Sequence, residues 1–179
     1  PLRFTIAGNS LSELSAELER QTDMVVEFMR TAGFSDDEIT SGPPSVTDSQ
    51  AQSYRSDAAF RYSGSRTVNV YTSDIDKVRK AQNELTALGK AGVVIVTGDY
   101  QTSVQYLFNG LNDIKPAMVE EATREARVVA QKFADDSGSA LGRIKSARQG
   151  QFSVSDRDSN TPYIKNIRIV STVEYFLAD

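Results

Sequence analysis

The sequence predicts an α+β protein, with an antiparallel-rich mixed sheet and three helices packed on one of its faces. One observation is that several short segments alternate apolar and polar residues, as half-buried strands do. Another is that three longer segments repeat apolar residues at steps of three and four, which is the period of an amphipathic helix. After a first strand, the predicted order is one helix followed by two strands, and this unit occurs three times. We therefore expect three helix-plus-hairpin units with antiparallel pairing.

The chain begins with a predicted strand at Leu2 to Ala7, where apolar and polar residues alternate. A helix follows, because Ser10 and Glu13 have the spacing of a capping box and Gly33 can end a helix. Its apolar stripe is Leu11, Leu14, Leu18, Val25, Met29 and Ala32. We expect this stripe to pack on the sheet.

An extended segment comes next, because Pro43 and Pro44 prevent a helix between Ile39 and Arg55. Val46 to Tyr54 is predicted to be a polar strand, and Thr67 to Tyr71 alternates as a second strand. These two strands are expected to form a long hairpin.

The second helix is predicted to begin at Ser73 or Asp74 and to end at Gly89 or Gly92. Its apolar side is Ile75, Val78, Ala81, Leu85 and Leu88. This side is expected to face the sheet.

A second hairpin is predicted after this helix. The β-branched run from Val93 to Val96 is typical of a central strand. Gly98 and Asp99 can then turn the chain into a partner strand at Ser103 to Phe108.

The third helix lies within Asn112 to Gly142. Asn112 or Asp113 is the expected N-cap, and Pro116 is placed in the first turn, where a proline costs no intrahelical bond. Ser137 and Gly138 mark the end. The stripe expected to be buried is Met118, Ala122, Ala126, Val129 and Phe133. Strands are then predicted at Leu141 to Val154 and at Ile167 to Leu177.

Composition restricts the possible functions. The chain has 179 residues, which we interpret as one domain spanning residues 1–179. A net charge of -4 argues against binding to nucleic acid, and the basic residues Arg143, Lys145 and Arg148 have the spacing of a partly exposed strand. No histidine or cysteine occurs, so catalytic triads, thiol nucleophiles, zinc-thiolate sites and disulfides are excluded. No cofactor is expected.

Cysteine-free composition also suits an oxidising compartment. The chain begins with Pro1 instead of methionine, so we interpret it as processed or truncated, with any signal peptide or anchor already removed. No apolar run approaches the roughly 20 residues of a membrane-spanning helix, and no membrane span is expected.

Three oxygen-bearing residues, Asp156, Asp158 and Asn160, are the best metal candidates, because their alternation can turn several oxygens to one side. A calcium loop needs a glycine where Thr161 and Pro162 follow, and it needs a closing glutamate. We therefore interpret the segment as a loop and assign no metal, catalytic or cofactor-binding residues. A second acidic run, Asp36 to Glu38, is interpreted as an exposed turn for similar reasons.

Three segments of the sequence resemble those of a known family. The segments Pro43 to Asp57, Gly98 to Val154 and Asp156 to Asp179, taken in this order, are similar to the bacterial SIMPL-domain family, also called domain of unknown function 541. The resemblance covers almost the whole chain. It implies a protein of the periplasm or outer membrane, with another strand ahead of Leu2 to Ala7.

The resemblance implies no catalytic residues. It suggests links with oxidative-stress tolerance and envelope functions, and it is compatible with self-assembly. Our first hypothesis is a non-enzymatic envelope module that binds protein partners or other copies of itself. The alternative is a carboxylate-based hydrolase, or a binder of small ligands, that acts on envelope material.

Overall fold

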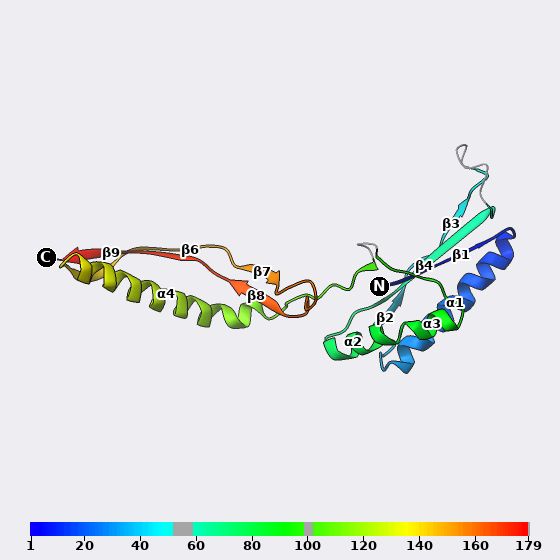
Figure 1. Cartoon of the computed structure of the whole chain (residues 1–179), viewed down its shortest axis with the longest axis horizontal. Helices are drawn as coiled ribbons and strands as arrows, with labels where there is room; N and C mark the ends of the chain where they lie inside the picture. The colour runs from blue at the N-terminus through cyan, green and yellow to red at the C-terminus, as the bar shows by residue number, and fades with distance from the viewer. Residues whose placement is uncertain (52–58, 99–101, 179) are drawn as a thin grey trace. The chain divides into compact units, whose positions relative to one another are not determined.

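The computed structural model describes residues 1–51, 59–98 and 102–178 (Figure 1). The chain divides into two compact units, which we call unit 1 (Pro1–Val104) and unit 2 (Gln105–Asp179). The expectation of one domain stays a prediction, because a compact unit is defined by contacts and not by independent folding.

A five-stranded antiparallel sheet forms the centre of unit 1. Its order is β2-β4-β1-β5, and β3 also pairs with β4. Their bounds are β1 (Leu2–Gly8), β2 (Ile39–Ser41), β3 (Ser45–Asp48), β4 (Tyr62–Val70) and β5 (Ile95–Val96). The predicted first hairpin is confirmed only in part, because β3 does pair with β4 but lies opposite Tyr62 to Ser65, whereas Val68 to Val70 lie opposite β2. The first strand ends at Asp48, earlier than predicted, because residues 49–51 form a turn, and residues 52–54 lie outside the described part.

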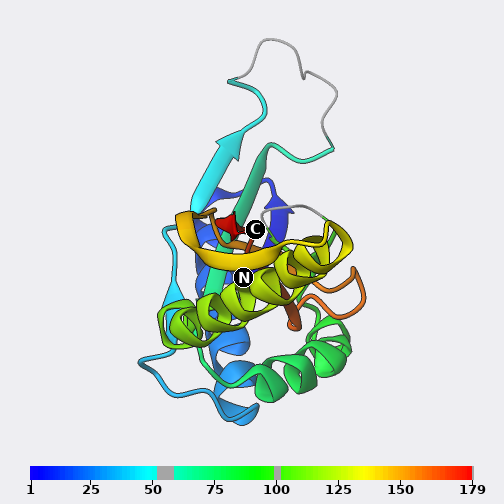
Figure 2. The same cartoon turned by 90° about the vertical axis from the view of Figure 1, so that its left-hand side faces the viewer.

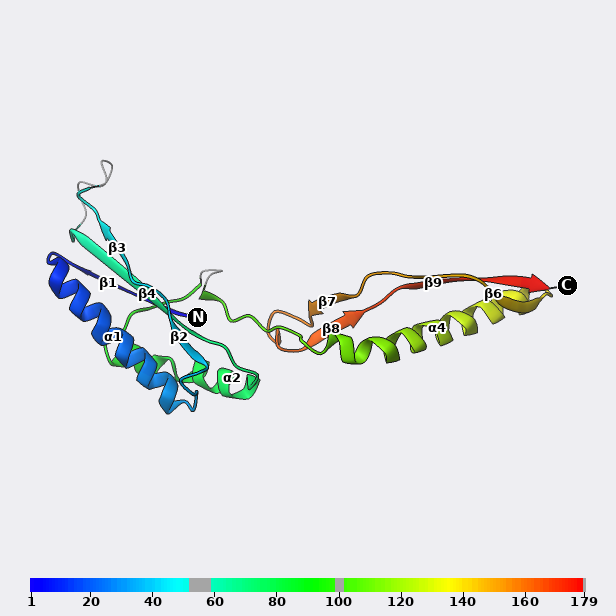
Figure 3. The same cartoon turned by 180° about the vertical axis from the view of Figure 1, so that it is seen from behind.

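Helix α1 (Leu11–Thr31) covers one face of this sheet (Figure 3). Its N-cap is Ser10, whose side chain accepts a hydrogen bond from the backbone N–H of Glu13 at 3.4 Å. The predicted stripe is confirmed at Leu14, Leu18, Val25 and Met29, which are all buried. Leu11 is exposed, contrary to the prediction, since it lies in the first turn at the helix end.

The second predicted helix is present as two short helices, α2 (Ile75–Glu84) and α3 (Thr86–Lys90). Asp74 is its N-cap, as predicted, and accepts the N–H of Lys77 at 2.9 Å. Ala81 and Leu88 are buried as expected, whereas Ile75 is exposed in the first turn.

The core of unit 1 lies between the helices and the sheet. The largest fully buried side chains are Phe4, Val25, Val68 and Val93, which come from β1, α1, β4 and the segment before β5. Burying a side chain of this size contributes about 1.5–3 kcal/mol, so these contacts fix α1 on the sheet.

The predicted second hairpin is wrong in its second strand. Ile95–Val96 does pair with β1, but the described residues of the Ser103 to Phe108 segment form no strand. Tyr106 instead lies edge-on to Tyr163, with ring centroids 5.8 Å apart, so the segment uses its side chains in another contact. Asp99 lies outside the described residues.

Unit 2 consists of helix α4 (Leu111–Asp136) and four strands, which form two antiparallel two-stranded sheets, β6-β9 and β7-β8. The strands are β6 (Ala140–Gln149), β7 (Ser153–Asp156), β8 (Lys165–Arg168) and β9 (Ser171–Ala178). The α+β class is confirmed, and the strands of the described residues lie in three sheets instead of one. The long strand predicted at Ile167 to Leu177 is divided between β8 and β9.

Of the two ends of helix α4, only the N-terminal end differs from the prediction. The helix begins at Leu111 after Gly110, so neither Asn112 nor Asp113 is the N-cap, and Pro116 lies inside the helix. A proline there deprives the carbonyl of Asn112 of its helical donor. The end is confirmed, because Ser137 caps the helix and Gly138 takes a left-handed φ of +70°.

Candidate interaction surface

Helix α4 lies on one face of the β6-β9 sheet (Figure 2). Ala134 is fully buried, whereas Phe133 is 71% exposed and Val129 also faces outward. The expected burial of Val129 and Phe133 is therefore wrong. The less exposed side of the helix continues at steps of four, whereas the prediction had moved to a step of three after Ala126. Ala134 is buried on this side, and Met118, Ala122, Ala126 and Ala130 are half-buried, as are the neighbouring Val119 and Thr123.

The buried face of α4 thus ends in alanines, which remove little apolar surface from water. Among the described residues, Ala134 is the one buried hydrophobic residue of unit 2, and all the others lie in unit 1. A two-stranded sheet is marginally stable by itself in water. Unit 2 therefore has far less internal support than unit 1.

Apolar side chains are instead exposed on unit 2 in large number. A soluble monomer rarely exposes a large contiguous apolar patch, and such patches mark interaction sites. The large exposed hydrophobic residues of unit 2 are Leu107, Phe108, Val128, Val129, Phe133, Ile144, Val154, Ile164, Val170, Phe176 and Leu177.

Several of these residues lie at one end of unit 2. Helix α4 ends at Asp136, and Ala140 then begins β6 opposite Ala178 of β9. Phe133 at the end of α4 and Leu177 at the end of β9 are therefore at the same end, and Leu177 is 59% exposed. This end is a candidate contact surface.

Strand β9 is paired with β6 along one edge, and no strand of the described residues covers its other edge. A free strand edge presents unpaired N–H and C=O groups, and proteins usually protect it with charges, proline or a bulge. Glu174 is the one charged residue in Ser171–Ala178. The free edge of β9 therefore lacks these protections.

Two basic residues of β6 contact side chains of β9. Arg143 lies over the ring of Phe176 at 5.4 Å, and Lys145 forms an ion pair with Glu174 at 3.6 Å. Both cations thus have partners on β9, as expected of a partly exposed strand and not of a polyanion site.

The metal candidates lie in the connection from β7 to β8. Asp158 Oδ1 accepts the backbone N–H groups of Asn160 and Thr161 at 2.9 and 2.8 Å, and its Oδ2 accepts the Thr161 hydroxyl at 2.5 Å. Asp156 forms an ion pair with Lys165. Both carboxylates thus serve a tight turn, and no group of metal-binding side chains is found in the described ranges.

The acidic turn after α1 is also held by protein contacts. Asp36 accepts a hydrogen bond from Nε of Arg30 at 2.8 Å, and Glu38 accepts one from the backbone N–H of Ser35 at 3.0 Å. Glu38 also accepts a hydrogen bond from Thr72, which lowers the pKa of Glu38, so this carboxyl group stays ionised at neutral pH.

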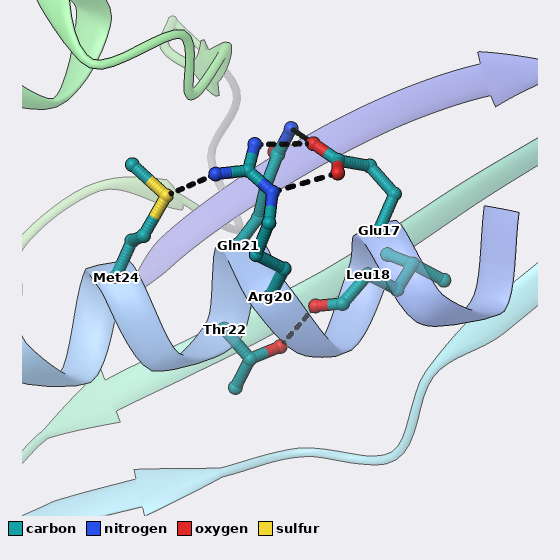
Figure 4. Close-up of polar contacts among 6 residues, drawn as sticks. All are labelled: Glu17, Leu18, Arg20, Gln21, Thr22 and Met24. Atoms are coloured by element: carbon teal, nitrogen blue, oxygen red, sulfur yellow. Dashed lines mark hydrogen bonds and ion pairs between the residues drawn. The ribbon is translucent and has the colours of Figure 1, made fainter. Parts of the chain in front are cut away.

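Carboxylates for hydrolysis would need one acid with a raised pKa. Hydrogen bonds from Thr161 and Arg157 lower the pKa of Asp158 to about 2, and those from Arg20 and Gln21 lower the pKa of Glu17 to about 2 (Figure 4). Neither carboxyl is suited to be a general acid at neutral pH.

Sequence reasoning missed two polar residues on the buried face of α1. Thr22 donates to the carbonyl of Leu18 at 2.6 Å, and Gln21 donates to Glu17 at 2.7 Å (Figure 4). The Oε1 atom of Gln21 is buried without a hydrogen-bond partner in the described residues. Both positions lie on the buried side of α1, but a search for regularly spaced apolar residues does not include polar side chains.

The fold and the surface define an antiparallel α+β protein whose second unit exposes much of its apolar surface. Residues 2–173 match the SIMPL family, described as a protein of unknown function (DUF541). This match spans most of the chain, so the protein belongs to the SIMPL family. No curated protein matches it. In the part of the chain that the structure describes, no helix has the length and apolar character needed to span a membrane.

Proposed function

We propose that this protein is a non-enzymatic interaction and self-assembly module of the bacterial cell envelope. The observation that carries the proposal is the imbalance of unit 2, where Ala134 is the one buried hydrophobic residue described while Phe133, Phe176 and Leu177 are exposed. Covering these side chains would contribute about 25 cal/mol per Å² of apolar surface removed from water, so association has a clear driving force.

An envelope location is supported by the composition and by the family resemblance of the sequence. A chain without cysteine carries no thiol that an oxidising compartment would trap in a wrong disulfide. We further propose a role in tolerance of oxidative stress, which deletion of the gene and exposure of the cells to peroxide would test.

The test of self-assembly is the molar mass of the purified protein, measured by light scattering over a range of concentrations. We expect a mass above the 19.6 kDa of one chain, rising with concentration. Crosslinking in intact cells, followed by fractionation, should recover the protein in envelope complexes. A strict monomer with no crosslinked envelope partner would contradict the proposal.

A further inference from the structure

We propose that two copies of this chain pair through the free edge of β9, so that their β6-β9 sheets join into one four-stranded antiparallel sheet across a two-fold axis. This inference rests on the proposed function and names the interface of the self-assembly. Both α4 helices would then lie on the same face of the joined sheet.

The two edges of the β6-β9 sheet differ in charge. Strand β6 carries Arg143, Lys145 and Arg148, whereas Glu174 is the single charge of β9. Lysine and other charges on an edge strand discourage pairing with another chain, and like charges directly opposite each other are destabilising. Pairing at the β9 edge is therefore favoured, and pairing at the β6 edge is opposed.

This difference also determines the symmetry of the assembly. Pairing of β9 with β6 of the next copy would repeat from copy to copy, as a larger ring or an open filament, whereas pairing of β9 with another β9 closes after two copies. Two antiparallel β9 strands oppose like charges only when the two Glu174 residues lie opposite each other. Every other register keeps these charges apart.

The backbone of β9 is oriented for such pairing. The N–H of Gly150 donates to the carbonyl of Val170 at 2.8 Å, so Val170 directs its carbonyl toward β6. Backbone groups along an antiparallel strand point alternately to its two sides. The register irregularities of this sheet insert their extra residues in β6, so the alternation along β9 continues. The N–H groups of Val173, Tyr175 and Leu177 consequently point to the free edge.

A shared register also brings exposed apolar side chains together. When Val173 lies opposite Val173 of the second copy, Phe176 lies opposite Val170 of that copy. Both side chains are exposed in the single chain, Phe176 at 44% and Val170 at 53%. Apolar cross-strand pairs of this kind stabilise a sheet.

A second copy is a better occupant of this edge than unit 1. Strand β9 has eight residues, whereas the unpaired strand edges among the described residues of unit 1 are shorter: β3 has four residues, and β5 leaves Ile6 to Gly8 of β1 without a strand partner on that side. Strand β4 is flanked by β1 on one side and by β2 and β3 on the other. In the register above, residues 171–175 of one β9 pair with residues 171–175 of the other, which is a longer match than either edge of unit 1 offers.

Single cysteines test this interface cleanly, because the chain contains no cysteine of its own. Thr172→Cys places a thiol on an exposed position of β9, where the register above sets it diagonal to Thr172 of the second copy. Arg148→Cys, which lies opposite Thr172 on β6, is the matched control. Each variant is treated with a short bis-maleimide, and the products are separated on a denaturing gel. We expect a covalent dimer from Thr172→Cys and little or none from the β6 control.

A proline variant gives an independent measurement. Leu177→Pro removes an N–H that points to the free edge and makes no bond to β6, and proline is tolerated on edge strands. Leu177→Ala keeps this N–H and is the control. We expect Leu177→Pro to lose the dimer in light scattering, Leu177→Ala to retain it, and both to keep the circular dichroism of the parent protein.

The outcomes separate the two proposals. If the protein assembles but crosslinks equally through β6 and β9, or if Leu177→Pro assembles as well as Leu177→Ala, the β9 interface is wrong and the self-assembly proposal stands. If every variant and the parent protein are monomers, both proposals are overturned.

Discussion

At the scale of single residues, Glu17 shows how hydrogen-bond donors on the same helix keep a carboxyl group ionised. Arg20 donates to its two oxygens through Nε at 2.8 Å and Nη2 at 2.6 Å, and Gln21 adds a third hydrogen bond (Figure 4). These donors favour the ionised carboxylate, and they lower the pKa of Glu17 from 4.5 to about 2.

A pH dependence of stability follows from this pKa. Because the carboxyl of Glu17 has a lower pKa in the folded chain than in the unfolded one, its contribution is complete above pH 4.5 and is lost as the pH falls toward 2. In Glu17→Gln, the unfolding free energy should decline less steeply across this interval. Urea denaturation at several pH values measures it, and identical slopes for the parent and the variant would contradict the prediction.

At the scale of elements, the sequence predicted those features that local chemistry controls. The N-caps Ser10 and Asp74, the stop at Gly138 and the buried stripe of α1 all follow from neighbours in the chain. The errors are different in kind. The burial of Phe133 and the partner of the Ser103 to Phe108 segment depend on which distant segments meet, and a single sequence does not contain that information.

The same limit applies to the candidate surface. The apolar residues of β9 were visible in the sequence, but the open sheet edge was not. Which strand would carry it was not visible, because the edge of β9 is defined by its pairing with β6 across more than twenty residues. The loop around Asp158 could be interpreted from sequence because its hydrogen bonds reach no further than Thr161.

The two N-caps provide a prediction at this scale. Asp74 accepts the N–H of Lys77 at 2.9 Å, whereas Ser10 accepts the N–H of Glu13 at the longer distance of 3.4 Å. We expect Asp74→Ala to cost about 1 kcal/mol of unfolding free energy and Ser10→Ala to cost less. Thermal and urea unfolding of both variants measure the difference, and a larger loss for Ser10→Ala would contradict this account.

At the scale of the whole molecule, the two units differ in what holds them together. Unit 1 has a core built from a sheet and the helices on it, with Phe4, Val25, Val68 and Val93 fully buried. Unit 2 has one long helix and two two-stranded sheets, and its apolar side chains are largely exposed. This contrast is the basis for proposing that unit 2 is completed by another copy of the chain.

Hydrogen–deuterium exchange at low and high protein concentration tests this claim most directly. The account predicts that the amides of Val173, Tyr175 and Leu177 exchange more slowly as the concentration rises, because their N–H groups become bonded in the assembly. Amides of α1 in unit 1 should show no such change and are the internal control. Exchange of β9 that is independent of concentration across the whole range would contradict the account.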